Sequence, residues 1–437
     1  MKSAKAKVMH DVAGRPILGH VIAAVRAAGV SRIVVVTAPG ADDVRAYATG
    51  EGAESVIQNE QLGTGHAAVC AASALADFAG VLVVAYGDMP LVTVETFEQS
   101  FAAREKAGMA IVAFRSSSHA YGRVIVDSDG MLARIVEFKD ANESERKVDL
   151  CNAGIMAADA KNFFRWAAAL KNENAQREYY LTDVPTFAKA DRVSCAVVQA
   201  READMMGVNS RSELASAERA MQQRLRAGAL DAGVGMIAPE TVFLSYDTVL
   251  EADVQVGPYV VFAPGVTVRS GAEIKAFSHL EGAEVGTRAL VGPYARLRPG
   301  AIIEEDVHIG NFVEVKKARI EKGAKANHLT YIGDARVGPG ANIGAGTITC
   351  NYDGFDKHFT DIGAGAFIGS NSALVAPVKV GDGVYVGAGS VITKAVADNA
   401  LAVTRAEQKE LPGWAEKFRN RKRAEKAAKK KTQGESK

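Results

Sequence analysis

The sequence predicts an α/β doubly wound domain followed by a parallel β-helix, and two patterns lead to this prediction. In the first half of the chain, apolar runs typical of strands alternate with runs of helical periodicity. From Val256 to Ile392, an aliphatic or small apolar residue recurs every six residues, with one slip and one long interruption. A period of six fits neither a helix nor an alternating strand. We therefore expect a first domain at residues 1–209, a connecting helix at 210–232, a β-helix at 233–405 and a basic tail at 406–437.

Three runs of the first domain are typical of buried strands. They are β-branched and nearly all apolar, as strands covered on both faces should be, and they span residues 32–37, 81–86 and 109–114. The helical runs are residues 17–28, 65–78 and 94–106. In such a domain, ligands bind beyond the carboxyl ends of the strands.

Polar candidates stand at the ends of these runs. Asp88 follows the second strand, where a carboxylate could bind a metal ion or cap a helix. Gly63 and Thr64 directly precede a helix, and amides there suit a phosphate or a nucleobase edge, although ordinary turns use the same residues. Lys7 could neutralise a phosphoryl group, and a solvated basic turn is equally compatible with its surroundings.

The six-residue period predicts a triangular solenoid. Each hexapeptide forms one short strand and turns a corner, so three hexapeptides close one coil and the coils stack. With strands about 4.8 Å apart, seven or eight coils span roughly 35 Å. A β-sandwich would instead show turn spacings of about 8 to 12 residues. The interruption between Thr349 and Ile362 inserts about seven residues, and insertions in solenoids collect at binding faces.

The connecting segment, the tail and the composition are typical of a protein that is neither secreted nor inserted in a membrane. Residues 210–230 are rich in Ala, Arg, Glu and Gln at helical period, and the net charge is +1. No secretory leader and no run of 18 apolar residues is present, so we expect neither secretion nor membrane insertion. Four scattered cysteines without zinc spacing indicate reduced thiols of a cytoplasmic protein. The basic tail favours a disordered solubilising segment over nucleic-acid binding.

Short motifs along the whole chain carry a family resemblance. They run AKVMH, QLGTGHA, YGDMPL, YGRV, VEFKDA, CNAGIM, EYYLTDV, GVNSR, YARLRPGA, NFVEVKKA, NHLTYIGDA, NIGAGTITCNYDG and VGAGSVITK. In this order they resemble the bacterial bifunctional N-acetylglucosamine-1-phosphate uridyltransferase and glucosamine-1-phosphate acetyltransferase family, and the last four are the most specific. The resemblance implies a Rossmann-like nucleotidyltransferase domain and a left-handed β-helix of hexapeptide repeats. It also implies synthesis of UDP-N-acetylglucosamine, a precursor of cell wall and lipopolysaccharide.

For the first domain, the resemblance implies exchange of the pyrophosphate of UTP for N-acetylglucosamine 1-phosphate. Lys7 is then expected to contact phosphate, and Asp88 with Asn209 to bind Mg²⁺. The remaining expected contacts are Gln58, Gly63 and Thr64 for uracil, and Gly122, Glu137 and Asn152 for the sugar. Such a reaction needs positioning and charge neutralisation more than a covalent nucleophile. One carboxylate and one amide oxygen, completed by phosphates and waters, suit Mg²⁺.

The first residues depart from the family pattern. Members open with an apolar strand and a glycine-rich loop, LAAGxGTRM, and Met1 stands where the last residue of that pattern would be. Ala6 replaces the usual Pro. We therefore expect a missing central strand, exposed apolar surface and fewer amides for the UTP phosphates. The alternatives are a misplaced start codon and a poor uridyltransferase with acetyltransferase activity only.

For the β-helix, the resemblance implies acetyl transfer from acetyl-CoA to glucosamine 1-phosphate. This reaction needs a base for the amine proton and a donor for the oxyanion. A lone histidine on a solenoid is usually a surface residue, but the resemblance makes His328 the base, oriented by Asn351. The expected glucosamine 1-phosphate contacts are Arg298, Lys316, Tyr331, Asn342, Lys357 and the pocket-shaping Tyr352. The expected acetyl-CoA contacts are Ala345, whose amide is the oxyanion donor, Ser370, Ala388 and Arg405.

The expected partners are these small molecules and two further copies of the chain. Three prisms associate in this family and share each acetyltransferase site, so we expect a homotrimer without nucleic acid. The basic tail is a further candidate contact for the 3′-phosphate of CoA.

Two other classes of function stay open. A single-activity nucleotidyltransferase with a non-catalytic β-helix would need neither His328 nor the NYDG insertion, and acetyl-CoA would not affect it. A scaffold with two relic sites is the other class. Retention of Asp88, Asn209, His328 and Lys316 argues against it.

Overall fold

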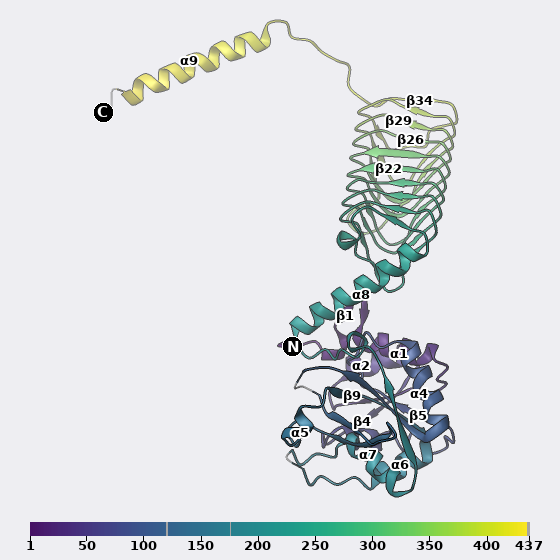
Figure 1. Cartoon of the computed structure of the whole chain (residues 1–437). Helices are drawn as coiled ribbons and strands as arrows, with labels where there is room; N and C mark the ends of the chain where they lie inside the picture. The colour runs from purple at the N-terminus through teal and green to yellow at the C-terminus, as the bar shows by residue number, and fades with distance from the viewer. Residues whose placement is uncertain (119–120, 175, 435–437) are drawn as a thin grey trace. The chain divides into compact units, whose positions relative to one another are not determined.

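The computed structural model describes residues 1–118, 121–174 and 176–434 (Figure 1). The chain forms two compact units, Met1–Arg288 and Ala289–Lys437. The first unit therefore holds the α/β domain, the connecting helix and the beginning of the repeat region. Among the described residues, no helix is both long enough and apolar enough to cross a membrane.

The main sheet of the first unit is mixed rather than purely parallel. Its order is β10-β6-β9-β7-β8, and β5 also pairs with β9. The bounds are β5 Val81–Val84, β6 Gly108–Arg115, β7 Arg123–Val126, β8 Leu132–Val136, β9 Leu150–Asp159 and β10 Ser194–Gln199. β10 runs parallel to β6, whereas β9 is antiparallel to both β5 and β6. β3 (Val34–Thr37) and β4 (Glu54–Ile57) form a separate parallel pair.

Helices cover both faces of the main sheet. The helices before the connecting helix are α1 Ile17–Ala27, α2 Asp42–Gly50, α3 Thr64–Cys70, α4 Val94–Ala107, α5 Glu143–Arg146, α6 Ala160–Ala168 and α7 Val184–Ala190. Of these, α4 and α6 lie on opposite faces of the main sheet, whereas α2 packs against β3 and β4. Alternate residues of β9 point to opposite sides, so Met156 packs with Phe163 of α6 while Ile155 packs with Phe97 of α4. The predicted helix at 65–78 ends early, because beyond Cys70 the amides of residues 71, 72 and 75 bond three residues back.

The connecting helix is α8, Arg211–Asp231. Ser210 and Glu213 form a capping box, which satisfies free amides at its first turn. Gln222 is buried and clamps the backbone of Leu244, donating to its carbonyl at 2.6 Å and accepting from its amide at 2.9 Å. The helix is thereby fixed to the first repeats within the same unit.

The repeats of the first unit are short parallel strands. They are β11 Gly235–Met236, β12 Val249–Leu250, β13 Gln255–Val256, β14 Val261–Phe262, β15 Thr267–Val268, β16 Glu273–Ile274, β17 His279–Leu280 and β18 Ala283–Val285. Gln255 pairs with Glu273 and Val261 with His279, each 18 positions on, which is three hexapeptides per coil.

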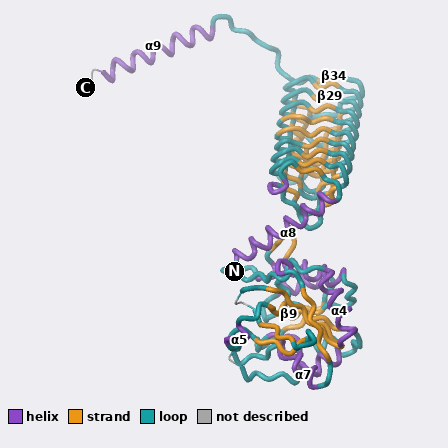
Figure 2. The backbone as a smooth tube through the Cα atoms, in the orientation of Figure 1, coloured by secondary structure: helices purple, strands orange, loops and turns teal. Residues whose placement is uncertain are grey.

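The second unit continues the same construction. Its strands are β19 Leu290–Val291, β20 Arg296–Leu297, β21 Ala301–Ile303, β22 His308–Asn311, β23 Glu314–Ile320, β24 Lys325–His328, β25 Tyr331–Val337, β26 Asn342–Ile343, β27 Ile348–Cys350, β28 Thr360–Ile362, β29 Phe367–Ile368, β30 Ala373–Val375, β31 Val378–Val380, β32 Tyr385–Val386, β33 Val391–Ile392 and β34 Leu401–Ala402. In Figures 1 and 2 these strands stack as the successive layers of a prism. Its interior holds the fully buried aliphatic residues of the six-residue period, such as Val291 and Ile309.

The insertion and the tail are the two departures from the repeat. Asn342 pairs with Phe367, 25 rather than 18 positions on, so the predicted seven-residue insertion is present in this coil. The tail differs from the disordered segment expected from its composition: α9 spans Trp414–Gly434. Its Ala, Glu, Lys and Arg content explains the difference, because these residues have high intrinsic helix propensity.

Candidate active sites

Three of the predicted residues of the first unit meet at one point. The ammonium of Lys7 lies 2.6 Å from a carboxylate oxygen of Asp88 and 2.8 Å from the amide oxygen of Asn209. Asp88 follows β5, and the amide of Val208 donates to its carbonyl at 3.0 Å, which brings the residue before Asn209 to the same edge. Residues more than 200 positions apart thus form one cluster.

The oxygens of this cluster fit a divalent cation. Asp88 and Asn209 both direct an oxygen at the same positive charge, the Lys7 ammonium. Mg²⁺ takes oxygen ligands and is commonly held by one or two carboxylates together with substrate phosphates. In the described part of the chain, no group of three or more His, Cys, Asp or Glu could hold a metal by itself. The cluster therefore suits a metal that arrives with a phosphorylated substrate.

The predicted sugar contacts also come together. Asn152 donates its amide to the carbonyl of Gly122 at 2.8 Å, and a side chain at Gly122 would meet both carboxylate oxygens of Glu137 at 3.4 Å. Burial raises the pKa of Glu137 above its usual range, and a hydrogen bond from Thr182 (3.1 Å) partly offsets this effect. A half-buried carboxylate beside a glycine is a suitable acceptor for sugar hydroxyls.

Tyr86 links the two groups and was not predicted as a site residue. Burial raises the pKa of its hydroxyl to about 12, the charges of Glu137 and Asp88 act in the same direction, and Thr64 is its hydrogen-bond partner. Its ring packs where Gly154 lacks a side chain. The sequence could have indicated this residue, because Tyr86 is the last residue of the predicted strand 81–86 and ligands bind at the carboxyl ends of such strands.

The predicted uracil contacts Gln58, Gly63 and Thr64 form hydrogen bonds with other residues of the chain. Gln58 donates to the carbonyl of Gly63 at 3.1 Å, and Thr64 accepts from the amide of Leu181 at 3.2 Å. At this helix start, the amide of Gly65 is not available to a ligand, because it donates to the carbonyl of Tyr179 at 2.8 Å. This hydrogen bond fixes the loop against the segment before α7.

In the second unit, six residues from successive coils form a column along the prism. They are Asn311, His328, Ala345, Ser370, Ala388 and Arg405. Asn311 pairs with His328 in parallel register. Backbone and side-chain hydrogen bonds then continue from coil to coil: Gly346 amide to Leu329 carbonyl (3.1 Å), Asn371 amide to Ala345 carbonyl (2.7 Å), Gly389 amide to Ser370 carbonyl (2.8 Å) and Arg405 guanidinium to Ala388 carbonyl (3.0 Å). The predicted base and all four predicted acetyl-CoA contacts therefore lie on one line.

The partner of the histidine is Asn311 and not Asn351. Nδ1 of His328 lies 2.8 Å from the amide oxygen of Asn311, so the imidazole donates through Nδ1. Asn351 instead donates to Asp334 and, at 3.5 Å, to the hydroxyl of Tyr331. Within one chain, the seven-residue insertion begins at Asn351 and turns its amide towards the neighbouring strand, so the role of Asn351 towards His328 stays a prediction.

The predicted phosphate-binding cations lie one corner away from the histidine. The amide of Arg298 bonds to Val315 at 2.8 Å, which sets it beside Lys316, and Lys316 pairs with Gly333. Because Gly333 has no side chain, the Tyr331 hydroxyl and the Asn351 amide can approach its backbone closely. Arg298 also forms an ion pair with Glu314 at 2.8 Å.

The other predicted residues lie in the inserted hairpin and in β26. Lys357 lies over the ring of Tyr352, 4.1 Å from its centre, within the inserted hairpin. Asn342 lies in β26, paired with Lys325 and Phe367. Within the hairpin, hydrogen bonds from the Asp356 amide and from His358 hold the pKa of Asp353 well below its usual range. Phe355 at its tip is 93% exposed.

Comparisons with known proteins find matches in both units of the chain. A MobA-like NTP transferase domain matches residues 1–177, and a bacterial transferase hexapeptide (six repeats) matches residues 359–394. "Bifunctional protein GlmU" of Paramagnetospirillum magneticum is 52% identical over 433 residues, which cover 98% of this chain and 96% of that protein. The chain belongs to the bifunctional GlmU family. The GlmU protein of Acidiphilium cryptum is 54% identical over 423 residues, covering 96% of this chain and 95% of its own.

The family assignment confirms the predicted fold class. A nucleotidyltransferase domain precedes a hexapeptide region, as in GlmU proteins, and the repeats form a left-handed parallel β-helix. A solved structure, a UDP-glucose pyrophosphorylase complexed with UDP-glucose, covers 50% of this chain and 90% of its own at 15% identity, with a TM-score of 0.41.

Proposed function

We propose that each unit carries one of the two activities of this GlmU family member. The chain is a bifunctional enzyme of UDP-N-acetylglucosamine synthesis. It transfers an acetyl group from acetyl-CoA to glucosamine 1-phosphate, and it transfers the uridylyl group of UTP to N-acetylglucosamine 1-phosphate with release of pyrophosphate. The observation that carries this assignment is the match to bifunctional relatives over 98% of the chain, which includes both sites.

His328 is the proposed general base of acetyl transfer. Since Nδ1 donates to Asn311, Nε2 carries the lone pair that accepts a proton from the substrate amine. The amine then attacks the thioester carbonyl, and the thiolate of CoA leaves. The amide of Ala345, one coil further along the column, is the proposed donor to the oxyanion.

The cations beside Gly333 are the proposed phosphate site. Arg298 and Lys316 supply positive charge on adjacent coils, and the hydroxyl of Tyr331 supplies a neutral donor. Charge-assisted hydrogen bonds to a phosphate dianion are about twice as strong as neutral ones. Ser370, Ala388 and Arg405 are proposed to line the path of acetyl-CoA along the column. Asn342, Tyr352 and Lys357 are proposed to complete the site from a neighbouring copy in a homotrimer.

The proposed uridyltransferase site is centred on the Lys7 cluster. Asp88 and Asn209 would hold Mg²⁺, which would neutralise phosphate charge during the transfer. When the nucleotide enters, the ammonium of Lys7 leaves the carboxylate of Asp88 and pairs with a phosphate oxygen. Gln58, Gly63 and Thr64 are proposed to position uracil, while Gly122, Glu137 and Asn152 position the sugar. A cytoplasmic location is proposed because UTP and acetyl-CoA are supplied there.

A split assay on the whole chain tests this function. One half follows CoA release from acetyl-CoA and glucosamine 1-phosphate, and the other follows pyrophosphate release from UTP and N-acetylglucosamine 1-phosphate with Mg²⁺. Both products are expected. Pyrophosphate release that is indifferent to acetyl-CoA, with no CoA release, would instead support a single-activity nucleotidyltransferase.

A further inference from the structure

The side-chain amide of Gln58, the proposed uracil contact, is held by two acceptors. Its Nε2 lies 3.1 Å from the carbonyl oxygen of Gly63 and 3.0 Å from Nδ1 of His66. The same carbonyl accepts from the amide of Ala67 at 3.1 Å, in the first turn of α3. Because a carbonyl oxygen can only accept, the nitrogen of Gln58 and not its oxygen must face Gly63. The orientation of the Gln58 amide is therefore fixed by its neighbour.

The second N–H of Gln58 sets the tautomer of His66. An amide nitrogen has no lone pair to offer, so Nδ1 of the imidazole must be the acceptor in this contact and Nε2 carries the ring proton. Nε2 lies 4.0 Å from the sulfur of Cys70, one turn further along α3, and a thiol is a weak acceptor for that proton. The ring also lies beside Tyr179, with 6.2 Å between the ring centres. His66 is thereby held as an acceptor towards Gln58.

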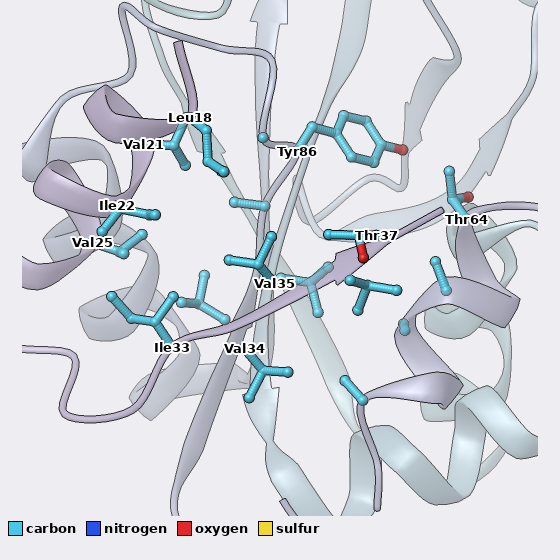
Figure 3. A pocket seen from close by; sticks show the side chains of 18 of the residues that line it. Leu18, Val21, Ile22, Val25, Ile33, Val34, Val35, Thr37, Thr64 and Tyr86 are labelled. Carbon is cyan, nitrogen blue, oxygen red and sulfur yellow. The ribbon is translucent and has the colours of Figure 1, made fainter. Parts of the chain in front are cut away.

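With both N–H groups engaged, the side-chain oxygen of Gln58 is the atom left for a ligand. Among the described residues, no donor bonds to this Oε1. The backbone amide of Gln58 donates to the carbonyl of Thr37 at 2.8 Å, at the end of β3. Thr37 and Thr64 line a cavity of about 510 Å³ (Figure 3), which Lys7 and Asp88 line as well. The fixed amide thus adjoins the proposed nucleotide site.

We propose that His66 is a positioning residue that makes this site select uracil over cytosine, an inference that rests on the proposed contact between Gln58 and the base. Uracil carries a hydrogen on N3, which Oε1 of Gln58 accepts. Cytosine has a lone pair there, so two acceptors would face each other. Cytosine could bond only to an amide turned over, and this would point Oε1 at the carbonyl of Gly63 and at Nδ1 of His66. A site that leaves polar groups unpaired in this way rejects the analogue.

Nitrogen-15 NMR of the whole chain labelled at histidine tests the hydrogen bond without any nucleotide. The signals of His66 are those lost in His66→Asn. At about pH 8, where free imidazole is neutral, we expect an unprotonated Nδ1 and a protonated Nε2. Gln58→Leu should shift the Nδ1 signal, because the donor to this nitrogen is lost. A protonated Nδ1 in the parent, or an unmoved signal in Gln58→Leu, would overturn the proposal.

Calorimetric binding of UTP and of CTP with Mg²⁺ tests the selectivity without requiring turnover. We expect the parent to bind UTP more tightly. His66→Leu removes one acceptor, so the ratio of the two affinities should fall about 3- to 10-fold, the effect of one hydrogen bond. His66→Asn loses the same ring but supplies Oδ1 near the place of Nδ1, and it should recover most of the ratio. If His66→Leu weakened both nucleotides equally, lost packing would explain the result and the proposal would be overturned.

Gln58→Leu separates this inference from the proposed function. If the affinity ratio falls in Gln58→Leu and stays parental in His66→Leu, the uracil contact stands and the positioning role of His66 fails. If neither substitution changes the ratio, or if the parent binds UTP and CTP equally, the proposed uracil contact is itself wrong and the selectivity fails with it. A fall in both variants, with recovery in His66→Asn, supports the proposal even where pyrophosphate release is absent.

Discussion

At the scale of single residues, the orientation of His328 depends on one side chain. The amide oxygen of Asn311 accepts from Nδ1 at 2.8 Å, and this leaves Nε2 unprotonated in the neutral ring. Asn311 and Asn351 are chemically identical, so composition could not distinguish them. The spacing could have done so, because Asn311 stands 17 positions before its register partner, close to one coil of three hexapeptides.

Replacing Asn311 should slow acetyl transfer at the chemical step. Asn311→Leu removes the acceptor and frees the ring to rotate or change tautomer, so we expect kcat to fall about 10- to 100-fold, a part of what a general base contributes. KM for glucosamine 1-phosphate should change little. Asn311→Asp retains an acceptor and should recover activity, with the acid limb of its pH–rate profile moved to higher pH. An unchanged kcat in Asn311→Leu would exclude the positioning role.

Glu137 gives a pH dependence to the stability of the first unit. Its pKa is raised by burial, so the folded protein keeps this proton to higher pH than the unfolded chain does. Between the two pKa values the unfolded state binds fewer protons, and the free energy of unfolding therefore falls as pH rises. Glu137→Gln should flatten this fall when urea denaturation is compared at about pH 4 and about pH 7. The exposed Glu105→Gln is the control, and a fall as steep as that of the parent would refute the assignment.

At the scale of elements, periodicity predicted the solenoid well and the α/β domain only in part. Every inward-facing position of the prism, such as Val291 or Ile309, needs a buried aliphatic side chain. Because this need recurs in each hexapeptide, the six-residue period is visible in the sequence alone. The predicted strands at 32–37, 81–86 and 109–114 became β3, β5 and β6. Their pairing could not be predicted, because an apolar run does not indicate that β9 will lie antiparallel between β5 and β6.

The connecting helix offers a test of how one element is fixed to the next. Gln222 satisfies both backbone groups of Leu244 in a buried position. Gln222→Ala leaves them without partners, and we expect it to lower the free energy of unfolding by about 1–3 kcal/mol. The neighbouring Gln223 is exposed, so Gln223→Ala should change it by less than about 0.5 kcal/mol. Equal effects of the two substitutions in urea denaturation would contradict this account.

At the scale of the whole molecule, each of the two units contains its own candidate active site. The Lys7, Asp88 and Asn209 cluster lies within Met1–Arg288, and the column from Asn311 to Arg405 lies within Ala289–Lys437. The sequence motifs predicted most members of both groups. They could not show which predicted residues a single chain brings into contact, since the structure describes no contact of Asn342, Tyr352 or Lys357 with Lys316.

The most direct test of this division is a crossed assay of His328→Ala and Asp88→Ala, with exposed His279→Ala as the control. His328→Ala should lower CoA release by about 10²- to 10⁴-fold and leave pyrophosphate release unchanged. Asp88→Ala should abolish Mg²⁺-dependent pyrophosphate release and leave CoA release at the parental rate. If either substitution lowered both activities together, or if His328→Ala released CoA as fast as the parent, the assignment of one activity to each unit would be contradicted.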